Sequence, residues 1–169
     1  NLKKLKKKGL IKKIGVSVYD PEEFLKIIKN YTIDVVQLPL SIFDQRFCSS
    51  SLIKQIYAKK IEVHARSIFL QGLLISSKKN LKKKYFKNND VLDQWFSFIK
   101  NNNKDAIFEC LKFVIKKRFV KKIVFGVNKL DHLKKIIKKL NLNYKTQSLD
   151  KFRTHDIKLI DPRKWKKIR

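Results

Sequence analysis

The feature that most constrains the fold is a regular alternation of short apolar segments with longer amphipathic ones. Four segments have the length and apolar character of buried strands, namely residues 14–18, 33–40, 61–65 and 121–127. Five segments carry apolar side chains at helical spacing, namely residues 20–31, 51–57, 91–99, 107–115 and 130–140. This alternation is typical of parallel βαβ units joined by right-handed crossovers.

The first full helix has a clear start. Asp20 is a favourable N-cap residue, Pro21 suits the first helical position, and Glu22 and Glu23 complement the helix dipole. The inward face of this helix is expected to comprise Phe24, Leu25, Ile27, Ile28 and Tyr31. The serines at 49–51 are N-cap candidates for the next helix, whose inward face is expected to comprise Leu52, Ile53, Ile56 and Tyr57. In the last helix we expect Leu130, Leu133, Ile136, Ile137 and Leu140 to face the core.

Four such units fit two architectures. One is a small doubly wound sheet, and the other is the second half of a (β/α)8 barrel, which needs eight strands and typically about 250 residues. We favour the barrel, with about four βα units (strands five to eight) in residues 1–140 and a tail with little regular pattern in residues 141–169. The chain contains no Met and opens inside what reads as a helix, residues 2–8, ended by Gly9. We therefore expect it to be the C-terminal portion of a longer protein.

The formal net charge of +28 suggests a nucleic-acid partner at first sight, because clustered cations release counterions when they meet phosphates. Only six of the 42 basic residues are Arg, however, and Arg is the residue that binds phosphate and guanine in a bidentate manner. Ile and Asn are abundant together with Lys, which indicates a compositional bias. We therefore expect no specific nucleic-acid partner. The alternative, a basic nucleic-acid-binding α/β module, has its best support in residues 82–87, where lysines adjoin Tyr85 and Phe86.

Other classes have less support. No run approaches the about 18 consecutive apolar residues of a membrane span, so no membrane association is expected. Cys48 and Cys110 lie far apart with no metal-ligand spacing around them, so we expect neither a metal site nor a disulfide, and a reduced, cytoplasmic location. The connection over residues 67–89 is long enough to be a functional loop, such as a lid over a substrate. The oligomeric state has no sequence indicator.

Several segments together resemble strands five to eight of the aldo-keto reductase family, in the order residues 10–17, 35–40, 65–74 and 123–128. Residues 160–165 look like the natural end of one bacterial branch of that family. The resemblance implies a (β/α)8 barrel that reduces an aldehyde or ketone, a small-molecule carbonyl substrate, by hydride transfer from NADPH or, less often, NADH. The family's catalytic Tyr, Lys, Asp and His lie on the first four strands. We therefore expect no catalytic residue in this chain and no activity from it alone.

The resemblance also implies a set of cofactor-binding residues. Ser17 and Gln37 match side chains that hold the nicotinamide amide, although Val18 stands where the family has Asn; a core Gln bonded to backbone is the alternative for Gln37. Arg66 stands where the family usually has a stacking Tyr. The residues that match the loop around the pyrophosphate are Ser67, Phe69, Leu70, Gln71 and Gly72.

After the last strand, the implied cofactor-binding residues are Gly126, Val127, Lys129 and His132. Backbone N–H groups at a helix N-terminus bind anions, and Lys129 and His132 are candidates to contact an adenosine 2′-phosphate. Lys129 could equally be one more solvated lysine. The implied cofactor is therefore NADP, with NAD as the alternative.

Overall fold

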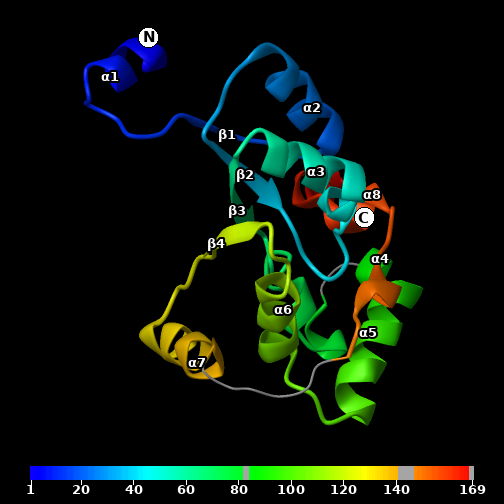
Figure 1. Cartoon of the computed structure of the whole chain (residues 1–169). Coiled ribbons are helices and arrows are strands. Elements are labelled where there is room, and N and C mark those ends of the chain that lie inside the picture. The colour runs from blue at the N-terminus through cyan, green and yellow to red at the C-terminus, as the bar shows by residue number, and fades with distance from the viewer. Residues whose placement is uncertain (82–83, 141–146, 168–169) are drawn as a thin grey trace.

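The computed structural model describes residues 1–81, 84–140 and 147–167, and these contain a parallel four-stranded sheet in the order β1-β2-β3-β4 (Figure 1). The strands are β1 (Gly15–Ser17), β2 (Val35–Pro39), β3 (Glu62–Arg66) and β4 (Val120–Val124). All of them overlap predicted segments, although β3 extends one residue beyond its segment to Arg66 and β4 begins one residue before its segment at Val120. The fourth strand ends at Val124 rather than at Val127, because its last paired residue, Val124, lies opposite Arg66, where β3 ends.

The strand order decides between the two predicted architectures. In a doubly wound sheet the order reverses at a switch point, whereas in a barrel each new strand is added on the same side of the last one. The order here is sequential, and all three pairings are parallel. The sheet therefore has the strand order of a (β/α)8 barrel fragment, and it is open, with β1 and β4 at its edges.

Helices follow the strands as predicted. The α-helices are α1 (Leu2–Lys7), α2 (Pro21–Asn30), α3 (Ser50–Ala58), α4 (Lys84–Lys87), α5 (Asp90–Asn101), α6 (Ala106–Ile115), α7 (Leu130–Leu140) and α8 (Ile157–Ile160). Short 3-10 turns cover residues 46–48, 73–75, 78–80, 150–152 and 162–167. The long connection between β3 and α5 thus contains local structure, including α4.

Two predicted helix ends are confirmed, whereas Ser49 precedes α3 without a side-chain capping hydrogen bond. The Asp20 carboxylate accepts a hydrogen bond from the Glu23 amide at 2.9 Å, and Pro21 is the first residue of α2. Gly9 follows α1 with a φ of 73°, and the Leu10 amide donates to the Leu5 carbonyl at 3.1 Å. This pairing is the Schellman closure, which favours glycine because it needs a left-handed residue.

The two faces of the sheet differ in burial, because successive side chains of a strand point to opposite faces. One face is apolar and fully buried, with Val36, Leu38, Val63 and Ala65. The other face, which we call the open face, is half-buried or exposed, and its residues include Ser17, Gln37, Glu62, His64 and Arg66. In a closed barrel this face is the interior.

Part of the predicted core is wrong. Tyr31 is 64% exposed because it caps α2 in an extended conformation and no longer follows the helical stripe. Tyr57 is also exposed, since it lies in the last turn of α3. In α7 only Ile136 is buried, while Leu130, Ile137 and Leu140 are exposed. This helix follows edge strand β4, and Figure 1 shows it standing away from α2 and α3.

The tail has more structure than its sequence pattern indicates. Leu149, Phe152, Leu159 and Ile160 are buried in the same core as the sheet. The Phe152 ring lies 5.4 Å from the Trp95 ring and 5.3 Å from the Phe98 ring, measured between centroids. In Figure 1 the tail returns to the body of the molecule, where the Thr154 amide donates a hydrogen bond to the Phe43 carbonyl at 3.1 Å. Residues 147–167 therefore belong to the folded unit.

We predict that Phe152→Ala lowers the free energy of unfolding by about 3–5 kcal/mol, because it removes the ring that packs on Trp95 and leaves a cavity. Urea denaturation followed by tryptophan fluorescence measures this change. Ile157→Ala, in the same segment but exposed, is the control and changes stability by no more than about 0.5 kcal/mol. Equal urea midpoints for Phe152→Ala and the unsubstituted chain would show that the tail does not stabilise the core.

Candidate cofactor site

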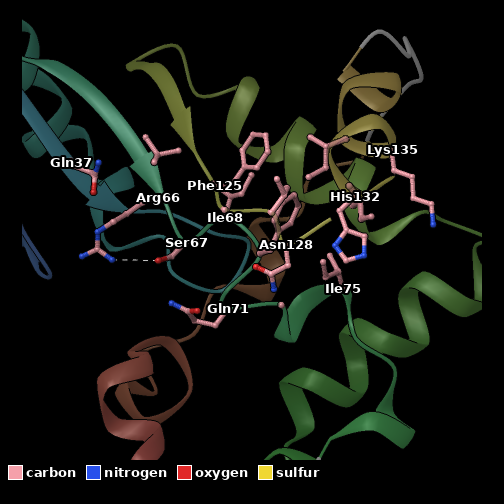
Figure 2. Close-up of a pocket in the computed structure, with 17 residues that line it drawn as sticks. Gln37, Arg66, Ser67, Ile68, Gln71, Ile75, Phe125, Asn128, His132 and Lys135 are labelled. Atoms are coloured by element: carbon pink, nitrogen blue, oxygen red, sulfur yellow. Dashed lines mark hydrogen bonds between the residues drawn. The ribbon is translucent and has the colours of Figure 1, made fainter. Parts of the chain in front are cut away.

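A cavity of about 840 Å³ lies at the carboxyl ends of β3 and β4 (Figure 2). Its walls come from the loop after β3, the loop after β4, the first turns of α7, and Ile107 of α6. Parallel strands that follow one another in a barrel bring their carboxyl ends to one edge, which is where barrel enzymes build their sites. The cavity therefore occupies the edge at which ligand binding is expected.

Most of the cofactor residues implied by the family resemblance line this one cavity: Gln37, Arg66, Ser67, Phe69, Gln71, Gly72, Gly126, Val127 and His132. Three others do not. Ser17 lies at the end of β1, paired in register with Gln37 on β2. Leu70 turns its side chain into the core, and Lys129 is exposed just before α7.

Other lining residues were missed by the sequence reasoning: Ile68, Ile75, Ile107, Val124, Phe125, Asn128, Lys135 and Ile136. Some could have been found from position alone. Phe125 and Asn128 belong to the same loop as Gly126, and Lys135 lies one helical turn beyond His132. Ile107 had no such indicator, because α6 reaches the cavity only through tertiary packing.

The loop after β3 has an unusual backbone. Ser67, Leu70, Gln71 and Gly72 all have positive φ values, between 47° and 85°. Such conformations cost of order 1–3 kcal/mol each for residues other than glycine and cluster at ligand sites. Turn hydrogen bonds hold the loop, including Leu70 amide to Ser67 carbonyl at 2.8 Å.

The same loop leaves backbone donors available. The amides of Ile68, Phe69 and Gln71 have no hydrogen-bond acceptor among the described residues. Successive amides in a turn with left-handed residues form concavities that bind anions. The Phe69 and Phe125 rings, 6.2 Å apart, join this loop to the one after β4.

The cavity is polar at both ends and apolar between them. Figure 2 shows Gln37, Arg66 and Ser67 at one side, His132 and Lys135 at the other, and Ile68 and Phe125 between. The Gln37 side chain is half-buried and has no hydrogen-bond partner in the described part of the chain. The alternative reading of Gln37, a core amide bonded to backbone, therefore has no support.

Arg66 is fixed at the edge of the cavity. Its guanidinium donates to the Val18 carbonyl at 3.0 Å and to the Ser67 hydroxyl at 3.3 Å. The same group lies 4.4 Å from the centroid of the Tyr19 ring, and the Arg163 guanidinium lies 3.7 Å from that centroid. Arg163 comes from the tail, so the tail contributes to the site.

A charged cluster lies on the open face around Glu62, the first residue of β3, whereas the cavity lies at the carboxyl ends of the strands. Lys13 donates a hydrogen bond to Glu62, His64 Nε2 lies 2.7 Å from Glu62 Oε1, and Lys122 Nζ lies 3.5 Å from that oxygen. Hydrogen bonds from Lys13 and then from His64 lower the pKa of Glu62 from 4.5 to about 2. Barrel interiors are usually filled by branched apolar side chains, so this cluster is a departure.

The structure also bears on the cysteines, on metal sites and on membrane-spanning helices. Cys48 and Cys110 are free thiols, and burial raises the pKa of both. Over residues 1–81, 84–140 and 147–167, no group of three or more His, Cys, Asp and Glu side chains could hold a metal ion. The same residues include no helix with the length and apolar character needed to traverse a bilayer.

The basic segment over 82–87 is only partly described. Lys82 and Lys83 lie outside the described residues, as does the side chain of Lys84. Phe86 is buried, with its ring 5.1 Å from the ring of Trp165. The Phe86 ring is therefore not available to stack on a nucleic-acid base.

Comparisons with known proteins agree with this geometry. A model of the aldo/keto reductase family matches residues 1–157. A sequence comparison with curated proteins gave no significant match.

Solved structures show the same fold. The holo and apo forms of aldo-keto reductase AKR11C1 from Bacillus halodurans match with TM-scores of 0.69 and 0.70, at 18% identity over 89% of this chain. A thermostable aldo-keto reductase, Tm1743, in complex with the inhibitor epalrestat, matches with a TM-score of 0.60 at 19% identity, also over 89% of this chain. The matches cover 51% of the holo AKR11C1 chain and 52% of each of the other two, so the chain spans about half their length.

We predict that the Glu62 cluster makes stability depend on pH. The folded-state pKa of Glu62 lies below its unfolded value of 4.5, so its contribution is present above pH 4.5 and is lost as the pH falls toward about 2. The urea midpoint of the unsubstituted chain should therefore fall more steeply over this range than that of Glu62→Gln. Parallel curves for the two proteins would contradict the assigned cluster.

Proposed function

The chain belongs to the aldo-keto reductase family, and from this premise we propose that it forms the cofactor-binding half of a barrel that reduces an aldehyde or ketone with NADPH or NADH. The observation that carries the proposal is the convergence of the loops after β3 and β4 on one cavity of about 840 Å³. The residues that the family resemblance implies for the cofactor come from both loops.

The residues around the cavity fit a dinucleotide in size and chemistry. Ligand cavities typically measure about 300–1,000 Å³ and combine apolar walls with a few placed polar groups. Here Ile68 and Phe125 supply apolar surface between two polar ends. The amides of Ile68, Phe69 and Gln71 supply donors for phosphate oxygens.

Gln37 is the group that would hold the nicotinamide amide. Its carboxamide both donates and accepts, which matches the donor and acceptor of the nicotinamide amide. Ser17 is its neighbour in register on β1 and would add one hydroxyl. Both groups lie on the open face of the sheet, so they would orient the ring over the interior of the completed barrel.

The far end of the cavity would hold the adenosine side of the cofactor. His132 and Lys135 lie on successive turns of α7 and both line the cavity, and His132 follows the helix start closely. A helix N-terminus favours negative charge, and a lysine adds a strong phosphate partner. We therefore assign a 2′-phosphate to His132 and Lys135 rather than to Lys129, which supports NADP over NAD.

The bound cofactor supplies the hydride that is delivered to the carbonyl carbon, and the residues of this chain bind and orient it. We assign none of them to proton transfer. His64 pairs with Glu62 on the open face, and His155 is exposed in the tail. The proton donor of the reaction would therefore belong to the other half of the barrel.

We predict that the double substitution His132→Ala and Lys135→Ala lowers the affinity for NADPH about tenfold or more and leaves that for NADH nearly unchanged. A charge-assisted hydrogen bond to a phosphate contributes about 1.5–3 kcal/mol. NADPH and NADH fluorescence on titration with protein measures both affinities. Lys138→Ala, on the same helix and exposed, is the matched control. An equal loss for both cofactors, or no loss, would contradict the 2′-phosphate assignment.

We also predict that the purified 169-residue chain shows no carbonyl-dependent oxidation of NADPH, because it lacks the proposed proton donor. Absorbance at the reduced-nicotinamide band, with an aldehyde or a ketone as substrate, measures this activity. A measurable rate that depends on the carbonyl compound would refute the proposed division of roles.

A further inference from the structure

Arg66 differs from two other arginines, half-buried Arg46 and exposed Arg163, in its charge balance. Arg46 pairs with Asp44, with two contacts of 2.8 Å, and Arg163 pairs with Asp161 at 2.7 Å. Arg66 bonds only to a carbonyl and a hydroxyl, and no carboxylate among the described residues pairs with it. Arg66 thus brings an uncompensated positive charge to the edge of the cavity.

The position of Arg66 is set by an aromatic platform. The Tyr19 ring lies beneath its guanidinium at 4.4 Å, a distance at which the ring attracts a cation. Two hydrogen bonds hold the Tyr19 backbone. Its amide donates to the Glu23 carboxylate, and its carbonyl accepts from the Arg46 guanidinium at 3.0 Å. The Tyr19 ring and the two hydrogen bonds of Arg66 therefore hold the guanidinium in place.

The tail completes this platform. The Arg163 guanidinium stacks on the same ring at 3.7 Å, and hydrogen bonds to Asp161 hold Arg163. Asp161 is only 5% exposed, and the hydrogen bond from Arg163 lowers the pKa of its carboxyl, so the pair stays charged. Two guanidinium groups thus share one ring, yet only that of Arg163 has a carboxylate partner.

This arrangement prepares Arg66 for an anion. A guanidinium presents its N–H donors in a rigid fork that matches carboxylate and phosphate oxygens. Two of these donors are occupied by Val18 and Ser67, and no other residue in the described ranges accepts a hydrogen bond from the rest of the fork. Because the side chain is already ordered, little conformational entropy is lost when an anion binds.

We propose that Arg66 binds the oxyanion of a carboxylate or phosphate group, and that Tyr19 and Arg163 are positioning residues for it. If the anion belongs to the carbonyl substrate, this inference rests on the proposed function and identifies the substrate class as acidic carbonyl compounds. If it belongs to the cofactor, Arg66 binds a cofactor phosphate. The chemistry at Arg66 is the same in both cases.

The test uses the 169-residue chain and two probes, inorganic phosphate and acetate, each titrated with and without saturating NADPH. Binding is followed through the Nε–H resonance of the Arg66 side chain, assigned by its loss in Arg66→Gln, and through protection against thermal unfolding. Arg66→Gln should weaken binding of both anions about tenfold. Arg118→Gln removes an equal charge from an exposed site and should leave binding unchanged.

The positioning residues have a separate test. Tyr19→Phe keeps the ring and should bind both anions like the unsubstituted chain, whereas Tyr19→Ala should lose most of the affinity although Arg66 remains. Urea midpoints establish that each variant is folded. Equal anion affinity in Tyr19→Ala and Tyr19→Phe would overturn the positioning role.

The titrations with and without NADPH distinguish a substrate anion from a cofactor phosphate. If the anions still bind when NADPH is present, the result supports an acidic substrate. If NADPH displaces the anions and Arg66→Gln binds NADPH more weakly, the result supports a cofactor phosphate. Unchanged anion affinity in Arg66→Gln overturns the proposal. A chain that binds the anions through Arg66 but never binds NADPH would refute the proposed function and leave the anion site standing.

Discussion

Parallel, in-order pairing of the strands is the constraint on which the rest of the structure depends. It aligns Ser17 with Gln37 and Gln37 with His64, and it brings the carboxyl ends of all four strands to one edge of the sheet. The cavity exists because the loops after β3 and β4 leave the sheet at that edge. It also produces the two unlike faces, one covered by helices and the other open, with a charged cluster where a closed barrel has its interior.

Features with a local origin could be predicted from the sequence, and features with a distant origin could not. The strands and the start of α2 at Asp20 follow from periodicity and capping, which depend on residues close in the chain. The exposure of Ile137 and the burial of Phe152 depend on what packs beside them in space. Family resemblance identified about half of the residues that line the cavity, but Ile107 required the structure.

The basic residues of this highly charged chain differ in their surroundings. Most lysines are exposed to solvent. Some acidic residues pair with several basic ones, and Glu62 contacts Lys13, His64 and Lys122. Near the cavity, the two arginines that contact Tyr19 differ in whether a carboxylate pairs with them. Asp161 pairs with Arg163, whereas Arg66, which contacts the same Tyr19 ring, has no carboxylate partner among the described residues. The tail therefore packs into the core through Phe152 and contacts the Tyr19 ring through Arg163.

The central claim is that the cavity between the loops after β3 and β4 binds the nicotinamide cofactor. The most direct measurement is a backbone amide NMR titration of the 169-residue chain with NADPH. We expect the shifts to be largest for residues 66–72 and 125–135, with little change over α2 and α3. Shifts spread over the lysine-rich helix surfaces, or no shifts in those two loops at saturating NADPH, would contradict the account.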